Sequence, residues 1–254
     1  MAALRAPITA RGPWLTAVLN VGAAHRLTGR PVAVVVEAHH QGRPEAVAFL
    51  HLRRRGFVTD VTLLGAGTPP LPDGRPPGRL LAGNPDAAVR LAAGIHELLG
   101  TLRGPWNLRL TGLPMGDPTA RALAALLPTG LIRTLRSAAL VDDLDDVGPV
   151  LRTRDPGALD GWLPALLDRA DASERELLRA AARLHAAIGQ VELAVVPDGG
   201  RARAALLTLV DGDDRWPWWG FGADGALRTQ LGVPVVELSV PARGWPPLPG
   251  VSRR

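Results

Sequence analysis

The chain has 254 residues, enough for one large domain or two of ordinary size. Hydrophobic residues make up 46% of it and the mean hydropathy is +0.10, which indicates a globular protein and excludes a disordered one. Its 29 basic residues are all arginine and give a net charge of +5, a usage typical of GC-rich genomes. Cysteine is absent, which excludes disulfides, thiolate catalysis and cysteine-based metal sites.

The arginines do not cluster as a nucleic-acid surface requires. The run His-Leu-Arg-Arg-Arg at 51–55 comes closest, but its place at a predicted strand end favours a solvated turn. No apolar stretch reaches the ~20 residues that span a bilayer. Arg5 and Arg11 precede an apolar segment at 14–24 that faintly resembles a signal peptide, and we interpret it instead as an amphipathic helix. We expect a cytoplasmic protein that binds neither nucleic acid nor membrane.

The first half of the chain predicts a helix and three strands, followed by alternating helices and strands. Turn residues separate the β-branched runs, and Asn84-Pro85 and Asp117-Pro118 match helix N-caps followed by proline. The alternation predicts parallel crossovers after an antiparallel meander, and hence a mixed sheet. The predicted helices are 14–28, 84–100 and 117–127, and the predicted strands are 32–38, 46–53, 58–64, 106–111 and 131–141.

An aspartate-rich run at 142–146 marks a boundary between two halves, which we place at 1–147 and 148–254. The second half repeats the order of helix and three-strand meander about 160 residues later, but lacks the helices that complete the first half. Ser173 and Glu176 have the spacing of a capping box at the start of the repeated helix. The predicted helices begin at Asp155 and Ser173, and the second ends at Gly189. The predicted strands are 191–196, 201–210 (apolar on both faces from 204), 215–222 and 233–240, and 241–254 is expected to be loose.

Helix, three-strand meander, helix, strand, helix, strand is the element order of the GNAT N-acyltransferase fold. Two such halves in one chain resemble the Fem-type and cellulose-biosynthesis-type acetyltransferase-like proteins. Local sequence adds to the resemblance, which covers 14–240: Leu63-Leu64-Gly65, Trp106 to Leu110 leading to Gly112-Leu113-Pro114, and the segment 189–222 with its aromatic last strand. It implies a mixed α+β fold with two tandem GNAT-like mixed sheets and flanking helices, the second copy being incomplete.

The resemblance also implies transfer of an acyl group to an amine from acyl-CoA, or from aminoacyl-tRNA in some members. Acyl-CoA is then the expected co-substrate and no metal is needed. Such chemistry uses helix N-terminal amides for the pyrophosphate, a bulge that polarises the thioester carbonyl, and a base. The family's phosphate-loop motif is absent, and residues 82–86 (Ala-Gly-Asn-Pro-Asp) stand in its place. This departure favours an alternative, a non-catalytic relative that binds a partner or small ligand.

Two side chains are candidates for the catalytic base. Glu192 lies in an apolar strand, on the face opposite the apolar side chains, where partial burial would raise its pKa. Alternatively it faces solvent or pairs with Arg201 or Arg203. His185 falls beside the apolar stripe of the preceding helix, where a packing role is the alternative.

The strand after these residues, Arg-Trp-Pro-Trp-Trp-Gly-Phe, has the most unusual composition in the chain. Alternation places Trp216 and Trp218 on one face and Trp219 and Phe221 on the other. We expect one pair in the core and the other in a ligand groove or subunit contact. Pro217 predicts an edge or bulged strand. The candidate ligand-binding residues, on the wall of a cleft between the halves, are Arg215, Trp216, Trp218 and Trp219.

Overall fold

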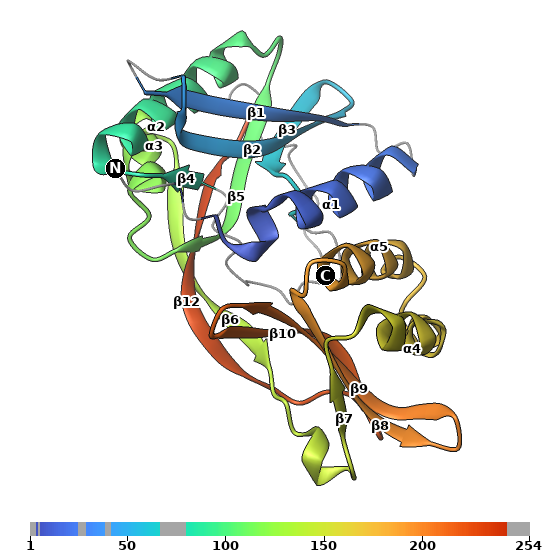
Figure 1. Cartoon of the computed structure of the whole chain (residues 1–254). Helices are drawn as coiled ribbons and strands as arrows, with labels where there is room; N and C mark the ends of the chain where they lie inside the picture. The colour runs from blue at the N-terminus through green and yellow to red at the C-terminus, as the bar shows by residue number, and fades with distance from the viewer. Residues whose placement is uncertain (1–3, 5, 25–28, 39–41, 67–79, 243–254) are drawn as a thin grey trace, which may run out of the picture.

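A computed structural model describes residues 4, 6–24, 29–38, 42–66 and 80–242 (Figure 1). These residues form two β-sheets and five α-helices, so the predicted mixed α+β class is confirmed. Residues 25–28 of the first predicted helix and 243–254 of the predicted loose tail lie outside the described residues. Among the described helices, none is long and apolar enough to cross a membrane.

The first sheet, which we call sheet A, has the strand order β1-β2-β3-β5-β12-β6, with β4 paired to β2. Strands β1 to β3 form the predicted antiparallel meander, and β5 lies parallel to β3, as the expected mixed sheet requires. Strand β12, the last described strand in chain order, pairs with both β5 and β6 of this sheet (Figure 1). The strands are β1 Gly29–Glu37, β2 Pro44–Arg55, β3 Val58–Leu63, β4 Leu80–Ala82, β5 Trp106–Pro114, β6 Leu131–Leu140 and β12 Thr229–Val240.

Two helices, α2 (Pro85–Thr101) and α3 (Pro118–Leu126), cover one face of sheet A and close its hydrophobic core. Both begin as predicted. The side chain of Asn84 accepts a hydrogen bond from the Ala87 N–H at 2.7 Å, and that of Asp117 accepts one from Ala120 N–H at 2.8 Å. These caps satisfy amides that have no partner within the helix. Buried residues of this core include Leu50, Val61, Ile95, Leu108, Leu110 and Leu238.

The second sheet, sheet B, is antiparallel throughout, with the order β11-β10-β9-β8-β7. Its strands β8 to β10 are the predicted second meander. Strand β9 is buried on both faces from Ala204 to Val210, as the apolar residues on both of its faces predict. The strands are β7 Leu151–Thr153, β8 Val191–Asp198, β9 Arg201–Asp211, β10 Asp214–Gly222 and β11 Gly225–Ala226.

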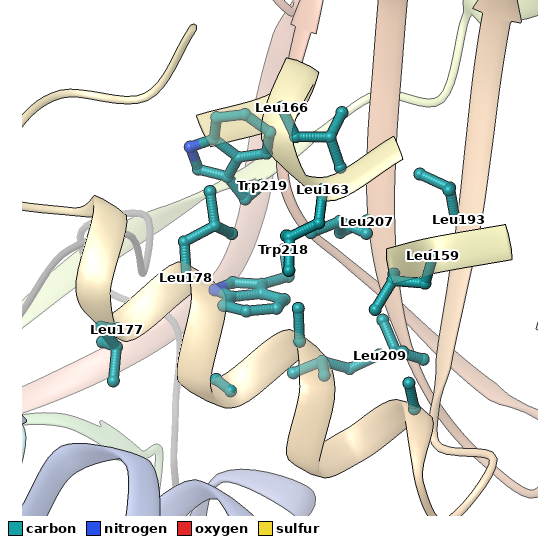
Figure 2. Packing of buried hydrophobic residues seen from close by; sticks show 14 of the residues in the cluster. Leu159, Leu163, Leu166, Leu177, Leu178, Leu193, Leu207, Leu209, Trp218 and Trp219 are labelled. Carbon is teal, nitrogen blue, oxygen red and sulfur yellow. The ribbon is translucent and has the colours of Figure 1, made fainter. Parts of the chain in front are cut away.

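Two helices, α4 (Pro156–Arg169) and α5 (Arg175–Ala186), cover one face of sheet B. Figure 2 shows their leucines around Trp218 and Trp219 of β10. Asp155 caps α4 as predicted. The predicted Ser173 cap of α5 is wrong: a turn that begins at Asp171 runs directly into the helix, so no extended N-cap residue precedes it. The residue before α5, Glu174, instead accepts a hydrogen bond from the Trp219 indole at 3.2 Å.

The N-terminal helix α1 (Gly12–Ala24) connects the two layers. It packs against α5 and buries Trp14 and Ala17 in the core of sheet B, while Phe49 and Leu64 of the first layer contact the same core (Figure 1). The N-terminal half of the chain thus supplies helix α1 to the core of sheet B, and the C-terminal half supplies strand β12 to sheet A. The division at 147/148 stays a prediction about sequence units, since the elements on either side are interleaved in space.

Candidate functional site

Glu192 forms an ion-pair cluster on the face of sheet B that turns away from the helices. Glu192 is 8% exposed, its carboxylate accepts two hydrogen bonds from the Arg215 guanidinium, and Arg154 Nε lies 3.5 Å from Glu192 Oε2. The hydrogen bonds from Arg215, opposed by burial, lower the pKa of Glu192. The predicted rise in pKa is therefore wrong, because antiparallel pairing brings Arg215 rather than Arg201 or Arg203 to the carboxylate.

His185 lies on the other side of sheet B, within the core beneath the helices. Its side chain is fully buried, its Nδ1 is 3.3 Å from Gln190 Oε1, and its ring centroid is 6.0 Å from that of Trp14. Burial lowers the pKa of His185 to about 4, so the imidazole is neutral at physiological pH. The structure does not bring His185 and Glu192 together, since they lie on opposite faces of the sheet.

The aromatic side chains of β10 all join the core on the helix side. Trp216, Trp219 and Phe221 pair with alternate residues of β9, and Trp218 is the extra residue of a bulge next to Pro217. The bulge predicted from the proline is confirmed, and it corrects the predicted faces, because one inserted residue reverses the alternation. Trp218 is fully buried and Trp219 is 8% exposed. The Trp218 and Trp219 rings therefore belong to the hydrophobic core of sheet B. Trp216 is half-buried at the margin of the same core.

A different place in the fold has the features of a site, namely the split between the parallel strands β3 and β5. Their ladder ends at the pair Thr62 and Arg109, one residue before β3 itself ends. Strand β5 continues to Pro114 and pairs there with β12 on its other side. Among the described residues, no strand occupies the β3 side of residues 110–114. Within the described part of the chain, the backbone groups of β5 therefore have no ladder partner along this edge.

The split lies beside a bulge and a buried carboxylate. The β5/β12 register shifts at Thr111 and Gly112, and Gly112 has a positive φ of 71°, which only glycine adopts without strain. Glu237 of β12 is 7% exposed and accepts hydrogen bonds at 3.2 and 3.0 Å from Arg109. Arg109 itself is mostly exposed, so one solvent-facing guanidinium joins the end of the β3/β5 ladder to a buried acid.

These groups belong to a row of polar side chains on the face of sheet A opposite α2 and α3, which we call the polar strip. The registers place its members on neighbouring strands, while the residues between them face the core. Alternation in the sequence shows polar positions in each strand, but not which strands are neighbours. The polar strip consists of His51 and Arg53 of β2, Asp60 and Thr62 of β3, Asn107 and Arg109 of β5, and Glu237 of β12.

The N-terminus of α2, where a pyrophosphate would be expected, is closed by its own residues. Asn84 occupies the Ala87 amide, Pro85 has no N–H, and Asp86 adds a negative charge to the first turn. An incoming phosphate would have to displace the cap and approach a carboxylate. The geometry therefore agrees with the absence of the phosphate-loop motif from the sequence.

No protein-family model matches the sequence, and no curated protein does. In fold, the chain is similar to a crystal structure titled "Conserved Protein of Unknown Function from Bacteroides thetaiotaomicron VPI-5482". The TM-score is 0.50 at 8% identity, over 90% of this chain and 89% of that one. FemX gives a TM-score of 0.43 at 10% identity, over 82% of this chain and 54% of FemX. At these identities the first likeness shows a shared fold alone, and we base no conclusion on the second.

Proposed function

We propose that this protein transfers an acyl group to an amine at the split between β3 and β5. The observation that carries the proposal is the separation of two parallel strands beside a bulge and a buried carboxylate. An extended donor chain with amide groups can hydrogen-bond to the free edge of β5, in the way that peptides add to sheet edges. The strand order of sheet A agrees with the resemblance to the GNAT fold.

In the proposed reaction the amine attacks the carbonyl carbon of a thioester. A C–N bond forms, the C–S bond breaks, the amine proton passes to a base, and the thiolate takes a proton from water. Backbone N–H groups at the bulge near Gly112 can polarise the carbonyl. We assign the base to Glu237, because Arg109 holds this carboxylate at the end of the β3/β5 ladder.

The two bases predicted from the sequence fit this role less well. Glu192 has a lowered pKa, which makes its carboxylate a weaker proton acceptor, and two arginines already pair with it. His185 is enclosed by the aromatic core and has no exposed surface through which an amine could reach it. Their catalytic roles stay predictions, and a Glu192→Gln variant with full activity would remove the first.

The test is release of CoA from acetyl-CoA in the presence of a panel of primary amines. Wild type and a control variant, Glu97→Gln on the exposed face of α2, should release CoA only when an amine is present. Glu237→Gln should lower the rate by about 100-fold or more, because a positioned base contributes that much. Full activity in Glu237→Gln would contradict the assignment of the base, and no release with any amine would contradict the transfer.

The closed N-terminus of α2 favours a second candidate, a non-catalytic protein that binds a small ligand. In that case the split holds an amide-containing chain that does not react. The tryptophan strand is a poor surface for such a ligand, because Trp218 and Trp219 are core residues. A rise in melting temperature with acetyl-CoA but without CoA release would support this candidate. An unchanged melting temperature together with no release would contradict acyl-CoA as the ligand in both.

A further inference from the structure

The arginine run at 51–55 has a feature that the proposed acyl transfer does not explain. Arg53 lies on the polar strip, and its Nε is buried without a hydrogen-bond acceptor among the residues that the structure describes. Within the same described residues, its guanidinium has no ion-pair partner. Burying a charged N–H without an acceptor is costly, because the group loses water and receives nothing in return. Such a group calls for a partner.

The neighbours of Arg53 do not supply that partner. Asp60 stands directly opposite it on β3, but this carboxylate is already bound by Arg55 Nε at 3.1 Å and by Asn107 Nδ2 at 2.9 Å. On the other side, Arg53 pairs with Gly29 of β1, which has no side chain. Among the described residues, two guanidinium groups therefore lie near one carboxylate that pairs only with Arg55, and the excess charge at this end of the polar strip is positive.

We propose that Arg53 binds an oxyanion, a carboxylate or phosphate group, on the face of sheet A opposite α2 and α3. A guanidinium presents several N–H donors in a planar fork that matches the two oxygens of such a group. His51 lies on the same face two residues earlier, packed closely over Gly29, where an added Cβ would lie 2.1 Å from its Nε2. The missing side chain at Gly29 thus leaves the space that the His51 ring occupies beside Arg53.

Burial, followed by the charge of Arg53, lowers the pKa of His51. At physiological pH the ring is therefore neutral and leaves Arg53 and Arg55 as the positive groups. Asp60 is the facing acid and Arg55 the other facing cation. An anion bound to Arg53 would offset the positive charge that lowers the pKa of His51. Anion binding at Arg53 and protonation of His51 are therefore linked.

The oxyanion site lies close to the proposed reaction site. The row of Arg53, Asp60 and Asn107 is two residues along the strands from the row of His51, Thr62 and Arg109, a step of about 7 Å. An acceptor amine that carries its own carboxylate or phosphate could place the amine at the split and the oxyanion at Arg53. This identification of the acceptor rests on the proposed function, whereas the oxyanion site does not.

Titration of the full chain with inorganic phosphate, and separately with acetate, tests the site at constant ionic strength set with sodium chloride. The readouts are the melting temperature and the Nε–H resonance of Arg53, which is assigned by its disappearance in Arg53→Lys. The matched control is Arg54→Gln, since Arg54 is the next residue, exposed and on the opposite face. We expect saturable shifts in wild type and in Arg54→Gln, with binding weakened by about tenfold or more in Arg53→Gln.

Equal binding by Arg53→Gln and wild type would overturn the proposal. So would an Arg53 Nε–H resonance that neither anion moves, a result that needs no variant to be folded. A response to phosphate alone or to acetate alone identifies which oxyanion the site accepts. The anion titration contains no acyl donor, so its result is independent of the separate CoA-release assay. Anion binding together with no CoA release in that assay would keep this site and contradict the transferase, and CoA release without anion binding would do the reverse.

Discussion

Acid should destabilise this protein through His185. The imidazole is fully buried beside Trp14, which packs in turn against Trp218. The indole N–H of Trp14 is a donor and cannot accept a hydrogen bond from the protonated ring. Burial lowers the pKa of His185 from 6.5 to about 4, the hydrogen bond to Gln190 opposes that shift, and the nearby charge of Arg11 adds to it. Folding therefore requires the neutral ring, while the unfolded chain protonates it more readily.

The size and sign of the effect follow from the two pKa values. Between 6.5 and about 4 the unfolded state binds more protons, so the free energy of unfolding falls as the pH falls through this window. The contribution is fully present above the unfolded value and is lost by the time the pH reaches the folded one. At ~1.4 kcal/mol per pKa unit, the total loss is about 3 kcal/mol, a large share of the stability of an ordinary domain.

The assay is urea unfolding at a series of pH values across that window, for wild type, His185→Gln and the control His96→Gln. His96 is exposed on α2, so its variant should keep the wild-type dependence on pH. His185→Gln should show a shallower dependence, and the difference from wild type removes the contributions of other groups such as His51. If the free energy of unfolding falls with pH equally steeply in wild type and in His185→Gln, the reasoning is refuted.

Two further predictions concern packing and capping. Trp218→Ala should lower the free energy of unfolding by about 3–5 kcal/mol, because removal of a fully buried indole leaves a cavity. Trp216→Ala should lower it less, because Trp216 is only half-buried. Denaturant unfolding compares the two variants, and equal losses of stability would contradict the bulge geometry. Asn84→Ala should cost about 1 kcal/mol through the lost cap of α2, measured in the same way, and an unchanged stability would show that the cap is replaced by solvent.

Local chemistry in the sequence predicts much of this fold. Asn84, Asp117 and Asp155 each precede a proline and cap a helix, because the side-chain oxygen and the fixed φ of proline act within one turn. The two meanders follow from apolar runs separated by glycine-containing turns. Ser173 failed as a cap because the preceding turn, which depends on Asp171, had already set a helical backbone there.

Long-range features of the site could not be predicted in this way. The residue paired with Glu192 depends on how three strands align, and sequence spacing alone suggested the nearer arginines. One inserted residue at Trp218 moved an aromatic ring from one face to the other. The polar strip is visible as alternation within each strand, but its assembly needs the registers that join β2, β3, β5 and β12.

The position of β12 explains why the candidate site needs both ends of the described chain. Strand β5 alone would leave Arg109 unpaired on one side, and β12 fills that side and contributes Glu237. The segment that leads to β12 passes through sheet B, whose core in turn requires Trp14 from α1. A change that loosens the helix-covered core of sheet B therefore also acts on the register that places Glu237 beside the split. The second half lacks two helices of the first, but the candidate site on sheet A cannot form without its strand β12.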